Sequence, residues 1–134
     1  MLLDREKFIN IEYLDYTKRI FGNCFRDDIK LIEEFYSNDS GGMGAYSLTY
    51  EYCNKPYQIV FDYERLYFDL YVKYGEWRTE NLGVSHLLFH GELKNKLDKA
   101  DIKKAIQILK WKSDEDDLEF YKITDTGKIK KLEK

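Results

Sequence analysis

Proline is scarce in this chain, with one in 134 residues, and cysteine is nearly as rare, with two. Cys24 and Cys53 form no CxxC pair and have no histidine neighbours, so we expect two reduced thiols, with a disulfide between them as the alternative. No run is long and apolar enough to span a bilayer, and the N-terminus lacks the pattern of a signal peptide. The sequence therefore predicts a cytoplasmic protein that does not enter a membrane.

An excess of basic residues is also missing. The chain has 22 Lys and Arg against 25 Asp and Glu, a formal net charge of -3 at pH 7 and a pI near 5.5. Proteins that bind nucleic acid directly usually carry a basic excess, because their cations release counterions from the phosphates. The balance favours a partner protein that is itself basic. We interpret the terminal lysines as a solvated strand end: Lys128, Lys130, Lys131 and Lys134.

Motifs that name a reaction are absent as well. No serine lies in a GxSxG nucleophile elbow, and neither cysteine has a sequence-local partner that marks it as a nucleophile. The stretch 40-SGGMG-44 follows a predicted helix, precedes a predicted strand and has no Lys-Ser/Thr pair, so we interpret it as a linker and not as a phosphate loop. We therefore expect a protein that is not an enzyme and that needs no cofactor.

The two histidines are the main candidates for a metal site. His86 and His90 are four residues apart, so on a helix they would share a face, with Glu92 nearby. The metallopeptidase pattern, however, requires a glutamate directly after the first histidine, and Leu87 stands there. We expect packed or half-exposed histidines and no metal.

The abundant residues are apolar and aromatic, at 43 % and 16 %, which is enough for one domain over residues 1–134 with its own core. The first third has helical spacing, with Phe8, Ile11, Leu14 and Phe21 near one face before Gly22 and Asn23. The segment 27-DDIKLIEEFYSN-38 predicts a second helix with an apolar stripe of Ile29, Ile32, Phe35 and Tyr36.

The stretch 46-YSLTYEYCNKPYQIVFDYERLYFDLYVKY-74 predicts a three-stranded meander. With turns at Asn54-Lys55 and Glu64-Arg65, one register satisfies all three strands and places the residues that face one another on a single core face. In that register Leu48 faces Phe61 and Tyr50 faces Ile59 across one pairing. Across the next pairing Phe61 faces Phe68, Ile59 faces Leu70 and Tyr57 faces Val72.

The opposite face of the meander mixes acids with tyrosines, which combine a large contact area with a hydroxyl. It is either a sheet face that is solvated or covered by a helix, or a binding surface. Its candidate partner-binding residues are Glu51, Asp62, Tyr67, Asp69 and Tyr71. The same carboxylates leave general acid and base catalysis as an alternative, although no cleft is indicated. They also disfavour base stacking on this face, because they repel phosphates.

The last third carries a helix and a hairpin. The sequence leaves open whether 76-EWRTENLG-83 is a strand or a loop, and it indicates a short helical or irregular segment at 85-SHLLFH-90. An amphipathic helix is predicted over 98–112, with Ile102, Ala105, Ile106 and Leu109 as its stripe. The acid run Asp114, Glu115, Asp116 and Asp117 ends this helix and joins the candidate partner-binding residues. A strand pair over 118–133 turns at Asp125 to Gly127.

Together these segments predict an α+β fold, an antiparallel β-meander packed against N-terminal helices and one later amphipathic helix. The aromatic meander, the helix 102-IKKAIQILKW-111 and the acidic 114-DEDD-117 resemble in overall pattern the immunity proteins of bacterial polymorphic-toxin and contact-dependent inhibition systems. That resemblance implies a stoichiometric inhibitor that binds a cognate toxin domain, frequently a nuclease. Two alternatives remain: a phage or mobile-element inhibitor that blocks a host nucleic-acid enzyme by imitating phosphate, and a small carboxylate-dependent enzyme.

Overall fold

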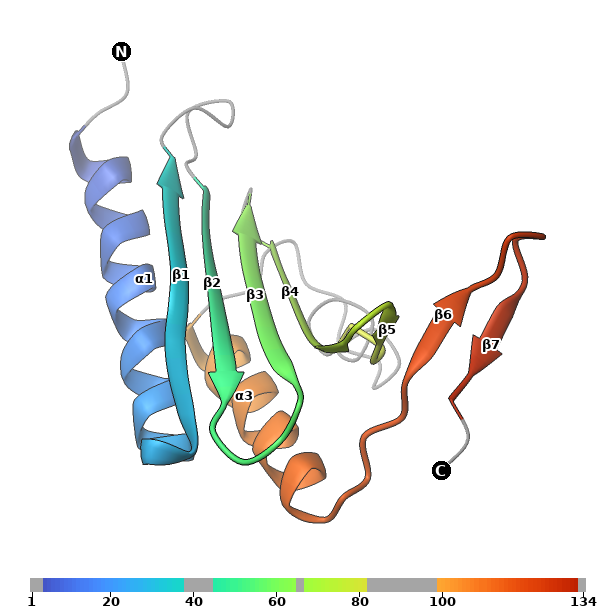
Figure 1. Cartoon of the computed structure of the whole chain (residues 1–134). Coiled ribbons are helices and arrows are strands. Elements are labelled where there is room, and N and C mark those ends of the chain that lie inside the picture. The colour runs from blue at the N-terminus through green and yellow to red at the C-terminus, as the bar shows by residue number, and fades with distance from the viewer. Residues whose placement is uncertain (1–3, 38–44, 65–66, 82–98, 133–134) are drawn as a thin grey trace.

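The computed structural model describes residues 4–37, 45–64, 67–81 and 99–132 (Figure 1). In this part of the chain two α-helices accompany an antiparallel sheet of seven strands that follow one another in sequence order. The predicted α+β class is therefore confirmed. The elements are α1 (Asp4–Phe25), the 3-10 turn η1 (Arg26–Asp28), β1 (Ile29–Ser37), β2 (Ala45–Tyr52), β3 (Gln58–Glu64), β4 (Tyr67–Tyr74), β5 (Trp77–Arg78), α3 (Lys99–Asp114), β6 (Tyr121–Ile123) and β7 (Ile129–Lys131).

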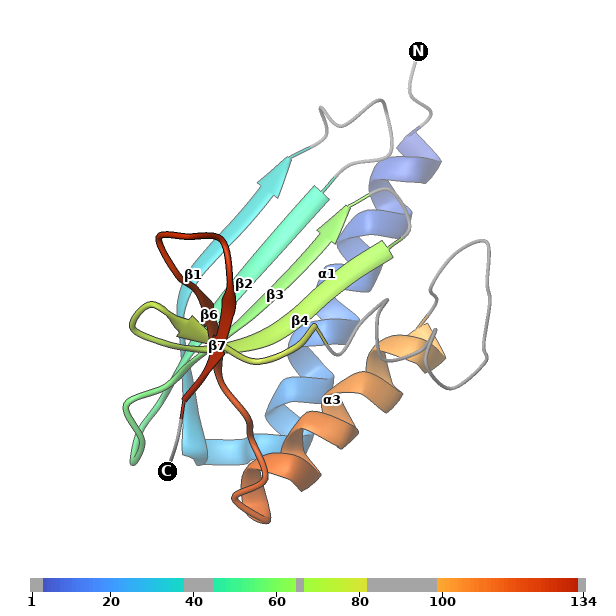
Figure 2. The ribbon, with the colours of Figure 1, turned by 90° about the vertical axis from the view of Figure 1, so that its right-hand side faces the viewer.

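Both helices cover the same face of the sheet, and no helix of the described segments covers the other face of β1–β4 (Figures 1 and 2). The N-terminal helix is confirmed, but it continues through Gly22 to Phe25. Phe25 is 1 % exposed and lies one turn after Phe21, which packs on Tyr50 with 4.5 Å between ring centroids. Burial of these rings outweighs the weak helix propensity of one glycine.

The prediction of a second helix over 27–38 is wrong, because this segment forms strand β1. It pairs with β2 from Ile29 opposite Tyr52 to the end of the strand, and the register shifts between Leu31 and Glu33. The extra residue at this bulge, Ile32, breaks the alternation of side chains and gives the segment its helix-like spacing. Only part of the predicted stripe is core: Ile29 is buried, whereas Ile32 and Phe35 are 43 % and 58 % exposed.

The meander is confirmed, and its first pairing has the predicted register, with Leu48 opposite Phe61 and Tyr50 opposite Ile59. The second pairing differs by two residues: Phe61 lies opposite Leu70, and Ile59 lies opposite Val72. Its ladder extends to Glu64 and Tyr67, so the connection is centred one residue later than the predicted turn. A shift of two preserves the face of every side chain, and the five residues predicted to share the core are all buried: Leu48, Ile59, Phe61, Phe68 and Leu70.

Stacked aromatic rings fill the space between the sheet and the helices. Phe61, fully buried, stacks on Phe68 at 5.1 Å and on Tyr46 at 5.8 Å between ring centroids. Buried hydroxyls tie the layers together, since the Tyr46 hydroxyl shares a hydrogen bond of 2.9 Å with Thr17 Oγ1 on α1. No buried side-chain polar atom of the described residues lacks a partner. The core is therefore both closely packed and satisfied in its hydrogen bonds.

The last third follows the sequence prediction closely. Helix α3 buries the predicted stripe and ends within the acid run, at Asp114. Strands β6 and β7 form the predicted hairpin, which we call the C-terminal hairpin, and Gly127 supplies the positive φ of +80° that its turn needs. The undecided segment 76–83 contributes the two-residue strand β5.

Several predictions fall on other parts of the chain. The stretches 40-SGGMG-44 and 85-SHLLFH-90 lie outside the described residues, as do the side chains of Phe8 and Ile11. Cys24 and Cys53 are both free thiols, as predicted. Neither α1 nor α3 has an apolar stretch of membrane-spanning length, and this holds for every helix in the described segments.

Candidate functional site

The face of β1–β4 that points away from the helices carries most of the candidate residues, and we call it the outer face. Strand pairing arranges its side chains in three rows that cross the sheet. The first row is Phe35, Ser47, Asp62 and Asp69. The second is Glu33, Thr49, Val60 and Tyr71. The third is Lys30, Glu51, Gln58 and Lys73. The middle row thus holds buried Val60 and half-buried Tyr71, and each of the three rows carries at least one carboxylate, with Lys30 and Lys73 at the ends of the third.

Two aspartates form the most unusual pair on this face. Asp62 on β3 lies directly opposite Asp69 on β4, and Asp62 is half-buried whereas Asp69 is exposed. Burial raises the pKa of the Asp62 carboxyl, and the Asp69 charge raises it further, against the opposing effects of the Ser47 hydrogen bond and the Arg78 charge. Asp62 therefore holds a proton more readily than a free aspartate does.

Arg78 and Tyr71 form a second pair beside the acids. The Arg78 guanidinium lies 3.7 Å from the centroid of the Tyr71 ring, which is a close cation–π contact. Tyr71 is half-buried, and burial raises the pKa of its hydroxyl. Because β5 pairs with β4 through Lys73 and Arg78, this short strand fixes the arginine over the tyrosine. The Arg78 guanidinium therefore covers one face of the Tyr71 ring and places a cation beside the two aspartates.

Asn81 forms a hydrogen bond with Asp69, the exposed member of the aspartate pair. Its side-chain amide donates to Asp69 Oδ1 at 2.6 Å, and its side-chain carbonyl accepts from the backbone N–H of Leu70 at 2.9 Å. In the same way Thr79 Oγ1 accepts from the N–H of Val72 at 3.0 Å. Side chains thus replace a neighbouring strand along this edge of β4, and they fix the backbone that carries Asp69.

The structure brings together Asp62, Asp69 and Tyr71, three of the predicted partner-binding residues. Glu51 lies on the same face but in the third row, next to Gln58 and opposite Lys30. Tyr67 begins β4 and pairs with Glu64, and its side chain lies outside the described residues.

Sequence reasoning missed several residues of this surface. Arg78 and Asn81 fell in the segment that was left undecided, and Phe35, Glu33 and Lys30 were assigned to a helix. Ser47 was placed on this face without a role. The alternation of polar residues in 76-EWRTENLG-83 was the one available signal, and two residues of regular pairing are too few for it to be recognised.

The acid run lies elsewhere, at the end of α3 on the helix-covered side of the sheet (Figure 2). Asp114 accepts a hydrogen bond from Lys110 Nζ at 2.8 Å, and Lys110 also lies 3.6 Å from Asp28. The helix closes with two backbone bonds, from the N–H of Asp117 to the carbonyl of Lys112 and from Asp116 to Ser113. These two bonds form a Schellman motif, in which Asp116 takes the left-handed position with φ 53°. Nearby Trp111 is 59 % exposed.

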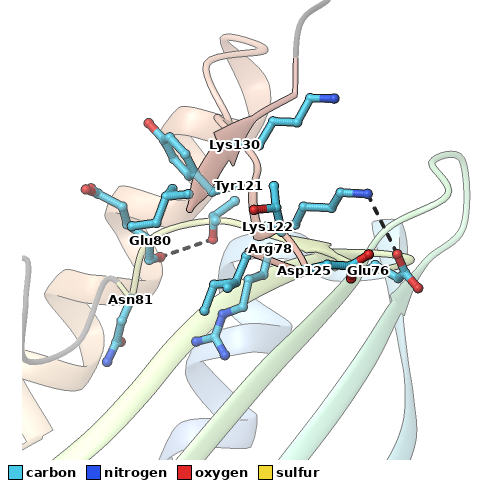
Figure 3. A pocket seen from close by; sticks show the side chains of 12 residues that line it. Glu76, Arg78, Glu80, Asn81, Tyr121, Lys122, Asp125 and Lys130 are labelled. Carbon is cyan, nitrogen blue, oxygen red and sulfur yellow. Dashed lines mark hydrogen bonds and ion pairs between the residues drawn. The ribbon is translucent and has the colours of Figure 1, made fainter. Parts of the chain in front are cut away.

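A cavity of about 1020 Å³ opens between the segment 76–81 and the C-terminal hairpin (Figure 3). Lys122 Nζ lies 3.9 Å from Glu76 Oε2 across it, and it also lies 4.9 Å from the centroid of the Trp77 ring. Arg78 and Asn81 line the cavity, whereas the two aspartates of the outer face do not. The carboxylate pair therefore lies on the outer face and outside this cavity.

Among the described residues no group of three or more His, Cys, Asp or Glu side chains is arranged to hold a metal ion. His86 and His90, the candidate ligands, lie outside those residues. Comparison of the chain with protein-family models, with curated proteins and with solved structures gave no match. No family's functional residues can therefore be mapped onto this surface.

Proposed function

We propose that this protein is an inhibitor that neutralises a basic partner domain, in the manner of a bacterial immunity protein acting on its cognate toxin, and that the outer face is its binding surface. The observation that carries the proposal is the make-up of this face. Its centre holds Val60 and Tyr71, and Asp62 and Asp69 lie in the adjoining row. An aromatic centre within a charged rim is the usual anatomy of a protein interface.

The sheet offers this face at little conformational cost to binding. Strand pairing, the contact of Arg78 with Tyr71 and the bond from Asn81 to Asp69 already hold the side chains in place. A partner that docks here gains contact area without ordering these side chains, which lowers the entropic cost of association. Exposed Phe35 extends the apolar area toward β1.

The negative net charge of the chain supports a basic partner, and nuclease domains are basic because they bind phosphates. The chain has a net charge of -3, and the acid run adds a second negative region beside α3. Acids outside the contact accelerate encounter through the long-range field, and a desolvated aromatic at the centre slows dissociation. The two candidate regions therefore have different roles, with the acid run steering the partner and the outer face holding it.

The test is co-expression of the chain with the toxin domain encoded by a neighbouring gene. The chain is expected to restore growth and to co-purify with the toxin in a one-to-one complex. The double variant Asp69→Lys/Tyr71→Ala is expected to lose both effects while remaining folded by circular dichroism. A matched control on the helical side, Asp15→Lys/Trp111→Ala, is expected to behave as the wild type. Equal protection by both double variants would show that the outer face is not the interface.

Two other functions would use the same residues. A phage inhibitor of a host nucleic-acid enzyme would bind a basic active site through the same acids, so the identity of the co-purifying enzyme distinguishes it. An enzyme is favoured by one observation, the raised pKa of the Asp62 carboxyl beside the Asp69 carboxyl, because a general acid needs such a shift. A turnover assay on the isolated chain, with Asp62→Asn as its control, separates catalysis from binding.

A further inference from the structure

The last strand of the sheet has a backbone edge that no described strand pairs. In the C-terminal hairpin the N–H of Leu132 donates to the carbonyl of Phe120, and the N–H of Thr124 donates to that of Lys128. Hydrogen-bonded and non-bonded pairs alternate in an antiparallel ladder, so Lys122 and Lys130 form the bonded pair between them. The backbone N–H and C=O groups of Ile129 and Lys131 therefore point away from β6, along the outer edge of β7.

The side chains beside this edge combine exposed apolar groups with positive charge. Ile123 and Ile129 lie opposite each other and are each 75 % exposed, more than any other large hydrophobic residue whose side chain the structure describes. Lys128 and Lys130 flank Ile129 on the other face of the hairpin. Residues 119–132 contain four lysines against two acids, a net charge of +2, in a chain whose net charge is -3. The hairpin is thus a basic element on an acidic protein.

Lysines on an edge strand are a common protection against self-association, and they have that effect here. A second copy that paired along β7 in antiparallel fashion would bring its own Lys128 and Lys130 close to these lysines, and like charges across a ladder destabilise it. A strand that carries acids at the corresponding positions is instead attracted by these lysines. The edge therefore discriminates between partners by charge.

We propose that the free edge of β7 binds an extended segment of a partner protein as an additional strand, and that this segment alternates acidic and apolar residues. The outward N–H and C=O groups of Ile129 and Lys131 supply the backbone bonds. Acids of the segment pair with Lys128 and Lys130. Its apolar side chains pack on the face of Ile123 and Ile129, where the cavity of about 1020 Å³ leaves room for them.

This site adjoins the outer face through Arg78 and Asn81, which line the cavity, and its occupant has the opposite charge. Lys131 contributes its backbone and not its charge, because its Nζ is bound to Glu119 Oε1 at 3.1 Å, and Glu119 also accepts from the Tyr121 hydroxyl at 2.8 Å. That arrangement holds the two strands of the hairpin in register and leaves Lys128 and Lys130 as the cations that meet the segment.

The test uses fluorescence polarisation on the full chain with a short labelled peptide of alternating glutamate and valine. Binding is expected to weaken as salt is added, because the pairs are exposed. Lys128→Glu/Lys130→Glu is expected to weaken it by roughly tenfold or more. Lys131→Pro removes the outward N–H and is expected to abolish binding, whereas Lys131→Ala, which removes only the side chain, is expected to bind as the wild type.

Two further peptides make the outcome decisive. A peptide of the same composition without the alternation, and one with lysine in place of glutamate, are both expected to bind at least tenfold more weakly. Equal binding of the rearranged peptide, or of Lys131→Pro, would reduce the interaction to charge alone and overturn the proposal. Absence of binding by the alternating peptide would overturn it as well, as would a dimer of the chain in solution that depends on β7.

Discussion

Asp62 and Asp69 face each other directly across the β3–β4 ladder on the outer face. Like charges at opposed positions weaken a sheet, and the half-burial of Asp62 adds a desolvation cost. Asn81 and Ser47 offset part of this cost by hydrogen bonding. The remaining penalty is consistent with our proposal that the pair serves binding, since functional surfaces commonly reduce stability.

The first prediction concerns the pH dependence of stability through Asp62. Its pKa is raised in the folded state, so the folded protein binds the proton more tightly than the unfolded chain does. The stabilising effect of that proton is present below the unfolded pKa of about 3.9 and is lost as pH rises through the higher folded value. Asp62→Asn, which is always neutral, is therefore expected to melt at a higher temperature than the wild type at pH 7.

Thermal melts at pH 7 and near pH 3 check this expectation. The advantage of Asp62→Asn should shrink toward pH 3, where wild-type Asp62 is itself protonated. Asp69→Asn is the comparison variant, because Asp69 is exposed: it removes the charge opposite Asp62 and the carboxylate that accepts from Asn81, and it leaves the half-buried carboxyl in place. A wild type that melts above Asp62→Asn at neutral pH would show that the carboxylate is stabilised by the fold.

The second prediction concerns the aromatic stack. Phe61→Ala removes a fully buried ring that stacks on Phe68 and Tyr46, so it is expected to lower the free energy of unfolding by about 3–5 kcal/mol. Phe35→Ala removes the same side chain from an exposed position on the outer face and is expected to change it by less than about 0.5 kcal/mol. Urea denaturation of both variants measures the difference. Similar losses would contradict the assignment of the two faces.

The third prediction concerns the end of α3. Asp116 occupies the left-handed position of the Schellman motif, where glycine has no steric cost. Asp116→Gly is therefore expected to stabilise the fold by about 0.5–1 kcal/mol, part of it from removing a negative charge at the negative end of the helix dipole. Asp116→Asn removes the charge alone and should gain less. A glycine variant less stable than the wild type would show that interactions of the Asp116 side chain outweigh the backbone strain.

The fourth prediction separates steering from holding. Charge reversal of the acid run, Asp114 to Asp117, is expected to lower the association rate with a basic partner and to flatten its salt dependence, with little change in the dissociation rate. Surface plasmon resonance at two salt concentrations measures both rates. If the reversal mainly raises the dissociation rate, the acid run lies inside the interface and not beside it.

The core could be predicted from the sequence because period-two alternation is insensitive to errors of two residues. The turn between β3 and β4 was misplaced by one residue, which moved every partner by two and left each side chain on its face. Strand β1 was misread because its bulge at Ile32 imitates helical spacing, and only pairing with β2 reveals the strand. Whether such a segment forms a helix or a strand depends on its tertiary contacts.

The candidate site was predictable only where it belongs to regular strands. Asp62, Asp69 and Tyr71 follow from the alternation of the meander. The positions of Arg78 and Asn81 depend on how the chain folds back along β4 after Gly75, whose φ is +59°. The separation of the acid run from the outer face is likewise a property of the layers, because α3 packs on the opposite side of the sheet (Figure 2). The local sequence therefore predicts neither the positions of Arg78 and Asn81 nor the separation of the acid run from the outer face.

The fifth prediction tests the proposed function most directly. It concerns the rate at which the Tyr71→Ala variant dissociates from the partner, measured by surface plasmon resonance. Loss of this central ring is expected to raise the dissociation rate and to cost about 2 kcal/mol or more of binding free energy, while Trp111→Ala, which removes an exposed ring on α3, leaves the rate unchanged. Both variants should be folded by circular dichroism. A folded Tyr71→Ala protein that binds as the wild type, together with a Trp111→Ala protein that dissociates faster, would contradict the outer face as the interface and assign binding to α3.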